Sequence, residues 1–199
     1  MTDARRPLRQ AQDRLLERAL ELDAIRYGDF LLTSGQRSTY YFDGRLLSLD
    51  PEGAYLLGKL LLPILRQARA EAIGGPTLGA DPIVAAVAVV SHLEGWPVPA
   101  FIVRKDPKEH GTRRTIEGPL RPGSRVAIVD DTCTTGGSLF HAIAEAEAAG
   151  CTVVKVIAIL DRNQGGSQEV RRRAYDFVSL LEATPEGQVR VTGSGAAAG

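Results

Sequence analysis

The chain has 199 residues, 44% of them hydrophobic, and its 24 lysine and arginine residues balance 24 aspartate and glutamate residues. This length predicts about one domain with an ample core, and the neutral charge argues against a nucleic-acid binder or a membrane-surface binder. No apolar run approaches the roughly 20 residues of a membrane span, and residues 1–6 lack the apolar centre of a signal peptide. Because Cys133 and Cys151 have no metal-ligand spacing, we expect a reduced, cytoplasmic protein.

Apolar periodicity predicts alternating helices and strands along the chain. We expect helices over residues 10–24, 51–69, 81–92, 139–149 and 167–173. We expect strands over residues 30–32, 40–43, 98–103, 126–129, 152–160 and 176–181, with one more beginning at residue 72 and the last one at an edge. This alternation predicts an α/β fold whose mostly parallel sheet is covered by helices on both faces. Residues 1–182 are predicted to form one domain, and residues 183–199 a disordered tail.

The stretch 125–138 links a buried strand to a helix through an acidic segment and a turn rich in hydroxyls and glycines. Residues 126–129 are continuously apolar, as in a parallel strand covered on both faces. Asp130 and Asp131 follow, at the end of the strand where open α/β sheets bind ligands. The glycines of the turn let the backbone approach a ligand, and the next helix offers unpaired amides and the positive end of its dipole. The turn is therefore predicted to hold an anion.

Two carboxylates beside an anion site need a different partner. Carboxylate oxygens accept hydrogen bonds from ribose hydroxyls or bind a divalent cation. The stretch therefore predicts a ligand with a phosphate, a sugar diol and Mg²⁺, and the alternative is an ordinary helix cap beside two solvated acids. Cys133 falls in the predicted turn, where a helix terminus can activate a thiol; a small residue that fills space is the more common case.

Two earlier segments also have features of a ligand site. Residues 33–43 form a polar turn followed by Tyr40, Tyr41 and Phe42, which can offer a stacking face to a planar heterocycle. Strand alternation puts Tyr40 and Phe42 on one face and Tyr41 on the other, and burial in the core is the alternative for such aromatic residues. Residues 74–81 place glycines between a strand and a helix, which makes a second candidate anion site.

Two later segments carry cationic side chains. Residues 104–114 hold five lysines and arginines and one histidine with little apolar content. A solvated loop is the ordinary interpretation, but a basic lid over about 104–118 would stabilise a leaving pyrophosphate and exclude water. Arg162, after the strand that follows the central helix, can hold a substrate carboxylate through two parallel hydrogen bonds, or can be a plain surface arginine.

Together these segments resemble the orotate phosphoribosyltransferase family, over about residues 20–181. The stretch 125–138 resembles the motif with which type I phosphoribosyltransferases bind 5-phosphoribosyl-1-diphosphate (PRPP). The family-specific parts are the early Thr-Ser-Gly-x-x-Ser-x-Tyr-Tyr-Phe-Asp segment, the Arg-Lys-x-x-Lys-x-His-Gly loop from residue 104, and Leu-Asp-Arg at 160–162. The resemblance implies the type I phosphoribosyltransferase fold, with a small N-terminal hood and a flexible lid loop.

The resemblance also implies roles for individual residues. Catalytic roles would belong to Lys108, His110 and Asp131. PRPP would be bound by Arg104, Lys105, Lys108, His110, Asp130, Asp131, Thr132, Cys133, Thr134, Thr135, Gly136, Gly137 and Ser138. Orotate would contact Tyr41, Phe42, Thr134 and Arg162. Mg²⁺ would be carried mainly by PRPP, with Asp131 contacting it through water and no direct protein ligand. The partners would be PRPP, orotate and a second copy of the chain, with the lid shared across a homodimer.

The reaction implied by the resemblance is transfer of ribose 5-phosphate from PRPP to N1 of orotate, which gives orotidine 5-monophosphate and pyrophosphate in pyrimidine biosynthesis. Two departures bear on the contacts: many members of the family have lysine where this chain has Thr33, and lysine near Leu78. Two alternatives remain at this point. One is transfer to another base, and the other is a PRPP-sensing protein that binds without turnover.

Overall fold

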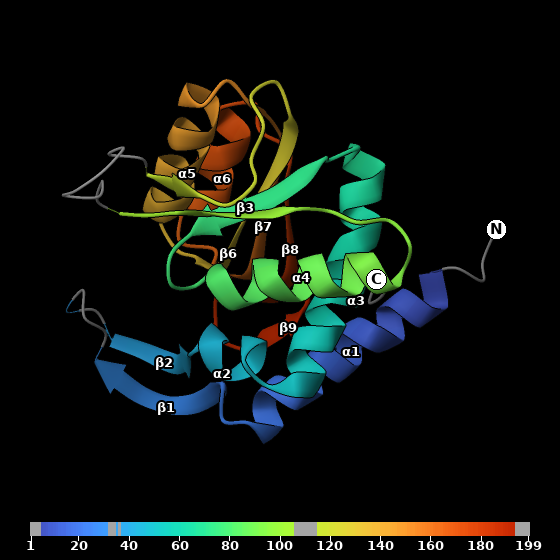
Figure 1. Ribbon diagram of the computed structural model, residues 1–199. Helices are drawn as coiled ribbons and strands as arrows, with labels where there is room; N and C mark the ends of the chain where they lie inside the picture. The colour runs from blue at the N-terminus through green and yellow to red at the C-terminus, as the bar shows by residue number, and fades with distance from the viewer. Residues whose placement is uncertain (1–4, 32–34, 36, 106–114, 194–199) are drawn as a thin grey trace.

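The protein folds around one seven-stranded sheet, with a separate two-stranded hairpin at one end (Figure 1). A computed structural model describes residues 5–31, 35, 37–105 and 115–193. The helices are α1 (Arg5–Glu21), α2 (Gly44–Ser48), α3 (Pro51–Ala68), α4 (Asp81–Leu93), α5 (Gly137–Ala148) and α6 (Gly166–Arg172). The hairpin strands are β1 (Ile25–Leu31) and β2 (Arg37–Phe42). The sheet strands are β3 (Ala72–Pro76), β4 (Ala100–Val103), β5 (Ile116–Glu117), β6 (Arg125–Cys133), β7 (Thr152–Asp161), β8 (Phe177–Ala183) and β9 (Val189–Val191).

The strand order of the sheet confirms the predicted fold class. From edge to edge the strands run β5-β4-β3-β6-β7-β8-β9, parallel from β4 to β8 and antiparallel at both edges. The chain moves from β3 outward to β4, and then returns to the other side of β3 to form β6. The direction of winding therefore reverses between β3 and β6, and open α/β sheets bind ligands in the crevice at such a reversal.

Helices cover both faces of the sheet, as the alternation predicts. Along β6, Ala127 and Val129 pack with residues of α3 and α4, whereas Val126 and Ile128 pack with residues of α5. All four side chains are fully buried, so alternate residues of β6 pack into two separate hydrophobic cores, one on each face of the sheet. No helix within the described ranges is long and apolar enough to cross a bilayer.

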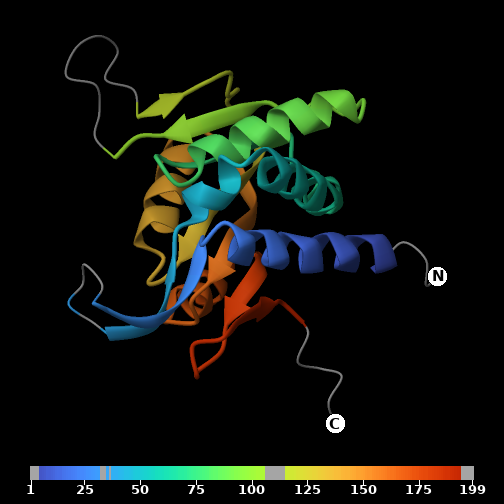
Figure 2. The same cartoon turned by 90° about the horizontal axis from the view of Figure 1, so that it is seen from below.

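The antiparallel pair β1–β2, here called the hood hairpin, projects from the sheet at the end where α1 turns into β1 (Figures 1 and 2). The predicted alternation is confirmed, since Tyr40 and Phe42 are buried in the core and Tyr41 is half-buried on the other face. The side chain of Asp50 accepts a hydrogen bond of 2.9 Å from the amide of Gly53, and this cap begins α3 at Pro51 as predicted.

The prediction of a disordered tail is wrong for residues 183–193. Val189 and Val191 alternate with exposed Arg190, and both valines are buried where β9 pairs with β8. Burial of these two side chains stabilises a strand that is too short to give a clear periodic signal. Because β9 covers β8, the segment predicted as an edge strand lies one strand inside the sheet. Residues 194–199 lie outside the described ranges.

Candidate active site

Two loops that the sequence singled out separately meet at the reversal point of the sheet. The strand β6 carries Asp130 and Asp131 at its carboxyl end, and the loop 77–80 follows the neighbouring strand β3. A Cβ atom added to Gly79 would lie 2.7 Å from Oδ1 of Asp130 and 2.7 Å from Oδ1 of Asp131. The backbone of the loop therefore lies directly against both carboxylates, and only glycine leaves that space open.

The two acids lie in an environment that disfavours their charge. Asp130 is 5% exposed and accepts hydrogen bonds from Ser138 Oγ at 2.6 Å and from the amide of Asp131 at 2.9 Å. Burial raises the pKa of Asp130 to about 7, and burial also raises the pKa of Asp131. A ligand that brings hydroxyl donors or a cation to these oxygens would relieve part of that cost.

The turn after the acids begins later than predicted. The strand β6 continues through Thr132 and Cys133, which pair with Leu160 and Asp161 of β7. The turn is therefore Thr134 to Gly136, and Gly136 has a φ of +84°, a conformation that favours glycine. Among the residues that the structure describes, no side-chain hydrogen bond caps α5, which begins at Gly137, so its first-turn amides have no side-chain acceptor there. Such amides are suited to bind an anion.

Gly166, which the sequence reasoning missed, packs directly against this turn. The amide of Gly166 donates to the carbonyl of Thr134 at 2.9 Å. A Cβ atom on Gly166 would lie 2.7 Å from Gly136 N, 2.7 Å from Thr134 O and 2.8 Å from Cys133 Sγ. The first residue of α6 thus packs against the turn without space for a side chain. The glycine pair at 165–166 was visible in the sequence, but nothing local indicated its partner.

Cys133 is a core residue, and the prediction that it lies in the anion-binding turn is wrong. Its side chain is fully buried, and burial raises the pKa of the thiol to about 12, so the thiolate is strongly disfavoured. Its carbonyl accepts a hydrogen bond of 2.9 Å from the amide of Arg162. The backbone at Cys133 therefore joins the end of β6 to the segment that carries the predicted carboxylate-binding arginine.

The guanidinium of Arg162 is fixed by the hood hairpin. It lies 4.6 Å from the centroid of the Tyr40 ring, and its Nη2 donates to Ser38 Oγ at 3.1 Å. Its Nε is buried and makes no hydrogen bond within the part of the chain that the structure describes. A buried donor without an acceptor is costly, so Nε is suited to receive an acceptor from a ligand.

The two aromatic residues predicted to contact a base are placed differently. The side chain of Phe42 is in the core, which leaves its backbone as the part that can face a ligand. The ring of Tyr41 is 5.8 Å from the ring of Phe30, and Arg26 stacks on it at 5.2 Å. The role of Tyr41 stays a prediction.

Two residues of α2 that the sequence reasoning did not select also lie near the acids. A Cβ atom on Gly44 would lie 2.7 Å from the Cβ of Asp131. Arg45 pairs with Asp43 at 2.9 Å, and its charge partly offsets the burial that raises the pKa of Asp131. Gly44 and Arg45 directly follow the segment 33–43, but no local pattern indicates that they lie near Asp131.

Comparison with known proteins decides the family. A family model for the phosphoribosyl transferase domain matches residues 76–191. The chain is 40% identical over 170 residues to the orotate phosphoribosyltransferase of Aquifex aeolicus, covering 84% of this chain and 93% of that protein. The chain belongs to the orotate phosphoribosyltransferase family. It is also 46% identical over 176 residues to the orotate phosphoribosyltransferase of Synechocystis sp., with 88% of each chain covered.

Solved structures of the family agree with this fold. The orotate phosphoribosyltransferase of Mycobacterium tuberculosis in complex with Fe(III) dicitrate superposes with a TM-score of 0.76 at 34% identity, covering 86% of this chain and 96% of that one. The same enzyme in complex with PRPP gives a TM-score of 0.73 at 32% identity, with the same coverage. The predicted resemblance is thereby confirmed.

The loop expected to close over the leaving group falls mainly outside the described residues, and Lys108 and His110 lie there. Its two ends are described: the amide of Arg104 donates to the carbonyl of Thr115 at 2.8 Å. His141 Nε2 lies 2.9 Å from the carbonyl oxygen of Arg104, and Thr115 donates to Glu145. Both ends are therefore attached to α5, the helix that begins at the predicted anion-binding turn, while Lys105 is exposed.

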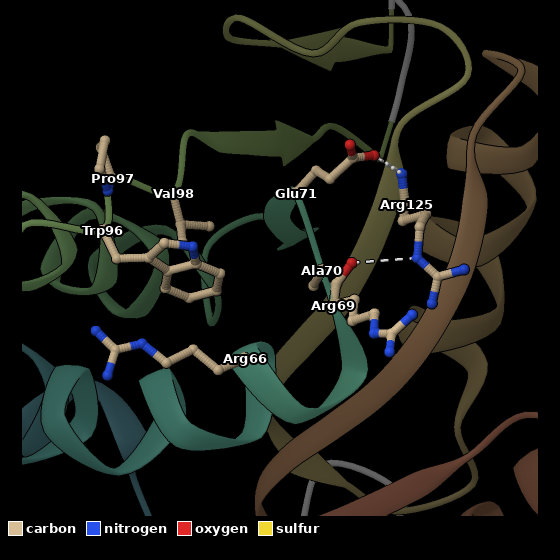
Figure 3. A pocket seen from close by; sticks show the side chains of 8 residues that line it. All are labelled: Arg66, Arg69, Ala70, Glu71, Trp96, Pro97, Val98 and Arg125. Carbon is tan, nitrogen blue, oxygen red and sulfur yellow. Dashed lines mark hydrogen bonds between the residues drawn. The ribbon is translucent and has the colours of Figure 1, made fainter.

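A hollow of about 770 Å³ lies far from these residues, at the amino ends of β3 and β6 (Figure 3). Arg125 on its wall donates to the carbonyls of Ala68 at 2.9 Å and Arg69 at 3.2 Å, and Arg66 stacks on Trp96 at 5.3 Å. Basic side chains at the carboxyl end of a helix stabilise its free carbonyls and its dipole. Capping of α3 accounts for Arg66 and Arg125, so we place the active site at the opposite end of the sheet.

Proposed function

We propose that the protein transfers ribose 5-phosphate from PRPP to N1 of orotate, forming orotidine 5-monophosphate and pyrophosphate. One observation carries the proposal: buried Asp130, half-buried Asp131, the start of α5, and the Nε of Arg162 lie at the same end of the sheet. Within the described residues no side chain caps α5, and that Nε has no acceptor. These are acceptors for a diol, donors for a phosphate and a donor for a carboxylate, which are the groups of the two substrates. Membership of the family supports the same reaction.

PRPP has three parts that match three parts of the site. Its 5-phosphate would bind to amides and hydroxyls between Thr134 and Ser138, at the positive end of α5. Its ribose hydroxyls would donate to Asp130 and Asp131. Its pyrophosphate would lie against the loop that contains Gly79, since that loop touches both acids. The PRPP complex of the Mycobacterium tuberculosis relative supports this choice of substrate.

Orotate would be oriented by Arg162. Its carboxylate can accept from the buried Nε, which has no other acceptor within the described ranges. Because Ser38 and Tyr40 hold the guanidinium, the arginine loses little freedom when orotate binds. Tyr41, the backbone of Phe42 and Thr134 would complete the contacts.

In the reaction the bond between C1 of the ribose and the pyrophosphate oxygen breaks, and the electron pair leaves with pyrophosphate. The bond between C1 and N1 of orotate forms, and the N1 proton passes to solvent, since the electron-withdrawing groups beside N1 make a strong base unnecessary. Positive charge develops on the sugar, and the carboxylates of Asp130 and Asp131 stabilise it. We propose that Lys108 and His110, with Arg104 and Lys105, stabilise the negative charge of the leaving pyrophosphate and exclude water.

Mg²⁺ fits this site as an ion that arrives with PRPP. Carboxylate oxygens are ligands that Mg²⁺ prefers, and burial disfavours the charge of Asp130 and Asp131, which a cation would offset. No group of three or more His, Cys, Asp or Glu side chains suited to a metal occurs among the described residues. The substrate would therefore supply most ligands, with Asp131 contacting the ion through water, and the ion would offset the charge of the pyrophosphate.

We propose that the protein acts as a homodimer in the cytoplasm. Large apolar side chains are exposed on and around α2, α3 and α4, namely Leu49, Tyr55, Leu78, Val89 and Leu93. Exposed apolar groups of this size and number are typical of a protein interface. Both cysteines are free and buried, which suits a reducing compartment. Leu93→Glu should shift the sedimentation coefficient toward that of a monomer if these helices form the interface.

A complementation assay tests whether the lid is shared. Lys108→Ala and Asp131→Asn are each expected to be nearly inactive alone, with Lys108→Ala lowering kcat far more than PRPP binding. If each active site takes its lid from the partner, mixing the two variants creates some dimers with one intact site, and activity returns. Mixed samples that stay inactive while exchanging subunits would contradict a shared lid.

The assay for the function follows loss of orotate absorbance with PRPP and Mg²⁺. Turnover with orotate, and none with adenine, guanine or uracil, is expected. Turnover only with another base, or PRPP binding without turnover of any base, would refute the proposal. Arg162→Lys should raise KM for orotate and leave KM for PRPP unchanged, because lysine cannot reproduce the planar contact.

A further inference from the structure

The segment expected to be a disordered tail contacts the hood hairpin. Beyond β8, the turn 184–188 leads into β9, and this C-terminal hairpin lies next to β1 and β2 (Figure 2). The amide of Val189 donates to the hydroxyl of Tyr27 at 3.1 Å, and Thr39 Oγ1 donates to the carbonyl of Glu186 at 3.4 Å. Residues about 150 positions apart in the chain therefore hold the two hairpins together.

The contact at the turn is close. A Cβ atom on Gly187 would lie 1.9 Å from Thr39 Oγ1 and 3.3 Å from Thr39 Cβ. Gly187 also has a φ of +85°, which permits the turn between β8 and β9. A side chain at this position would have to displace Thr39 Oγ1, either by rotating the threonine, which breaks its hydrogen bond to Glu186, or by moving the hood hairpin away from the C-terminal hairpin.

The residues touched by the C-terminal hairpin lead directly to Arg162. Tyr27 is paired with Tyr40 across the hood hairpin, and the guanidinium of Arg162 stacks on Tyr40. Thr39 follows Ser38, whose hydroxyl accepts from Arg162 Nη2. On the other side, Asn163 Nδ2 donates to the carbonyl of Ala183 at 2.8 Å, at the end of β8. The C-terminal hairpin thus contacts Asn163, which follows Arg162 in the chain. It also contacts the hood residues next to Ser38 and Tyr40, the two side chains that hold the guanidinium.

We propose that the C-terminal hairpin, residues 177–191, positions the orotate site, with its Gly187 and Tyr27 of the hood hairpin as positioning residues. By holding the hood hairpin in place, it keeps Ser38 and Tyr40 against Arg162 and leaves Nε available for the carboxylate. The inference rests on the proposed contact between Arg162 and orotate. It implies that loosening this contact weakens orotate binding selectively, since the PRPP-binding turn is attached to α5 and α6 instead.

The experiment compares three variants with a matched control. Gly187→Ala inserts a methyl group against Thr39. Gly123→Ala is the control: it makes the same change at a φ of +84°, where the added Cβ would have no atom within 4 Å. Thr39→Ala combined with Gly187→Ala removes the clashing oxygen, and Tyr27→Phe removes one hydrogen bond without loss of the ring. For each variant KM for orotate, KM for PRPP, kcat and hydrogen exchange of the β2 amides are measured.

Gly187→Ala is expected to raise KM for orotate about tenfold, because displacements on the order of 1 Å at an active site cost up to about a hundredfold. KM for PRPP should stay unchanged, the β2 amides should exchange faster, and the double variant should recover most of the orotate affinity. Tyr27→Phe should raise KM for orotate about threefold to fivefold, as expected for one hydrogen bond. Gly123→Ala should change none of these.

Equal increases in both KM values, or no recovery in the double variant, would overturn the inference. So would unchanged hydrogen exchange in Gly187→Ala. If exchange is faster but KM for orotate is unchanged, the hairpin holds the hood without positioning orotate, and the inference is also wrong. Arg162→Lys measured alongside separates this from failure of the proposed function: an unchanged KM for orotate in that variant shows that the arginine does not bind orotate.

Discussion

Gly166→Ala is the substitution that most directly tests how the anion-binding turn is supported. Gly166 lies outside the predicted PRPP contacts and belongs to a different helix. A methyl group there would meet the backbone of Thr134 and Gly136 at 2.7 Å and Cys133 Sγ at 2.8 Å. The two nearest atoms, Thr134 O and Gly136 N, belong to the backbone and cannot rotate away as a side chain can, so either the turn or the start of α6 must move.

The size of the movement can be worked out from these contacts. Ordinary van der Waals contact for a Cβ atom begins near 3.4 Å, so the atoms at 2.7 Å must separate by about 0.7 Å. Overpacking of this kind costs roughly 1–3 kcal/mol of folding free energy. A displacement approaching 1 Å in a substrate-positioning element can lower turnover by up to about a hundredfold. We therefore expect kcat/KM for PRPP to fall about thirtyfold, more than stability alone would explain.

The assay is the steady-state rate against PRPP concentration at saturating orotate, with thermal unfolding measured in parallel. Gln168→Glu on the same helix is the control, because this side chain is exposed and the substitution keeps an acceptor for Ser167 Oγ, so both measurements should stay unchanged. A folded Gly166→Ala variant with wild-type kcat/KM for PRPP would refute the reasoning. That result would mean that α6 does not determine the position of the turn.

Three other predictions concern single residues. Asp130→Asn should abolish most turnover yet stabilise the fold above pH 7. The pKa of Asp130 is about 7 in the folded protein and 3.8 ordinarily, so the free energy of unfolding of the wild type falls as the pH rises between these values. The loss is up to about 4 kcal/mol, and an uncharged asparagine avoids it. In melts without Mg²⁺, this advantage should vanish below about pH 4, and its persistence there would contradict the cause given. Cys133 should resist iodoacetamide in the native protein at pH 8 and react after denaturation, because its thiol is fully buried; rapid native labelling would argue against its burial. Val191→Asp should destabilise the fold by about 3 kcal/mol or more, since it buries a carboxylate without a partner, whereas a disordered tail would tolerate it in the same thermal melt.

Local pattern was sufficient for the main features of this protein. The apolar run at 126–129 predicted a strand covered on both faces, and each face is indeed packed by a different set of helices. The Asp50-Pro51 pair predicted the start of α3, and the side chain of Asp50 caps it. The order of acids, hydroxyls and glycines after the strand predicted a PRPP-type ligand. These features are determined by neighbours in the chain, so the sequence displays them directly.

The misplaced elements depend on distant partners. Thr132 and Cys133 were predicted to lie in the turn, but pairing with β7 extends β6 through both residues. The side chain of Cys133 therefore lies in the core. Residues 189–191 read as tail, but β8 offers a paired edge and a buried face. In both cases hydrogen bonds to the neighbouring strand determine that the segment is extended. Segments this short have too little apolar periodicity for the strand to be predicted from sequence.

The active site shows the same division. The available groups, including Asp130, Asp131 and Arg162, could be recognised from the sequence alone. The contacts of Gly79 with the acids, of Gly166 with the turn and of the hood hairpin with Arg162, whose Nε has no acceptor within the described ranges, became visible only in the fold. The physical reason is that side-chain chemistry is a property of each residue, whereas close approach and burial are properties of pairs that the fold brings together.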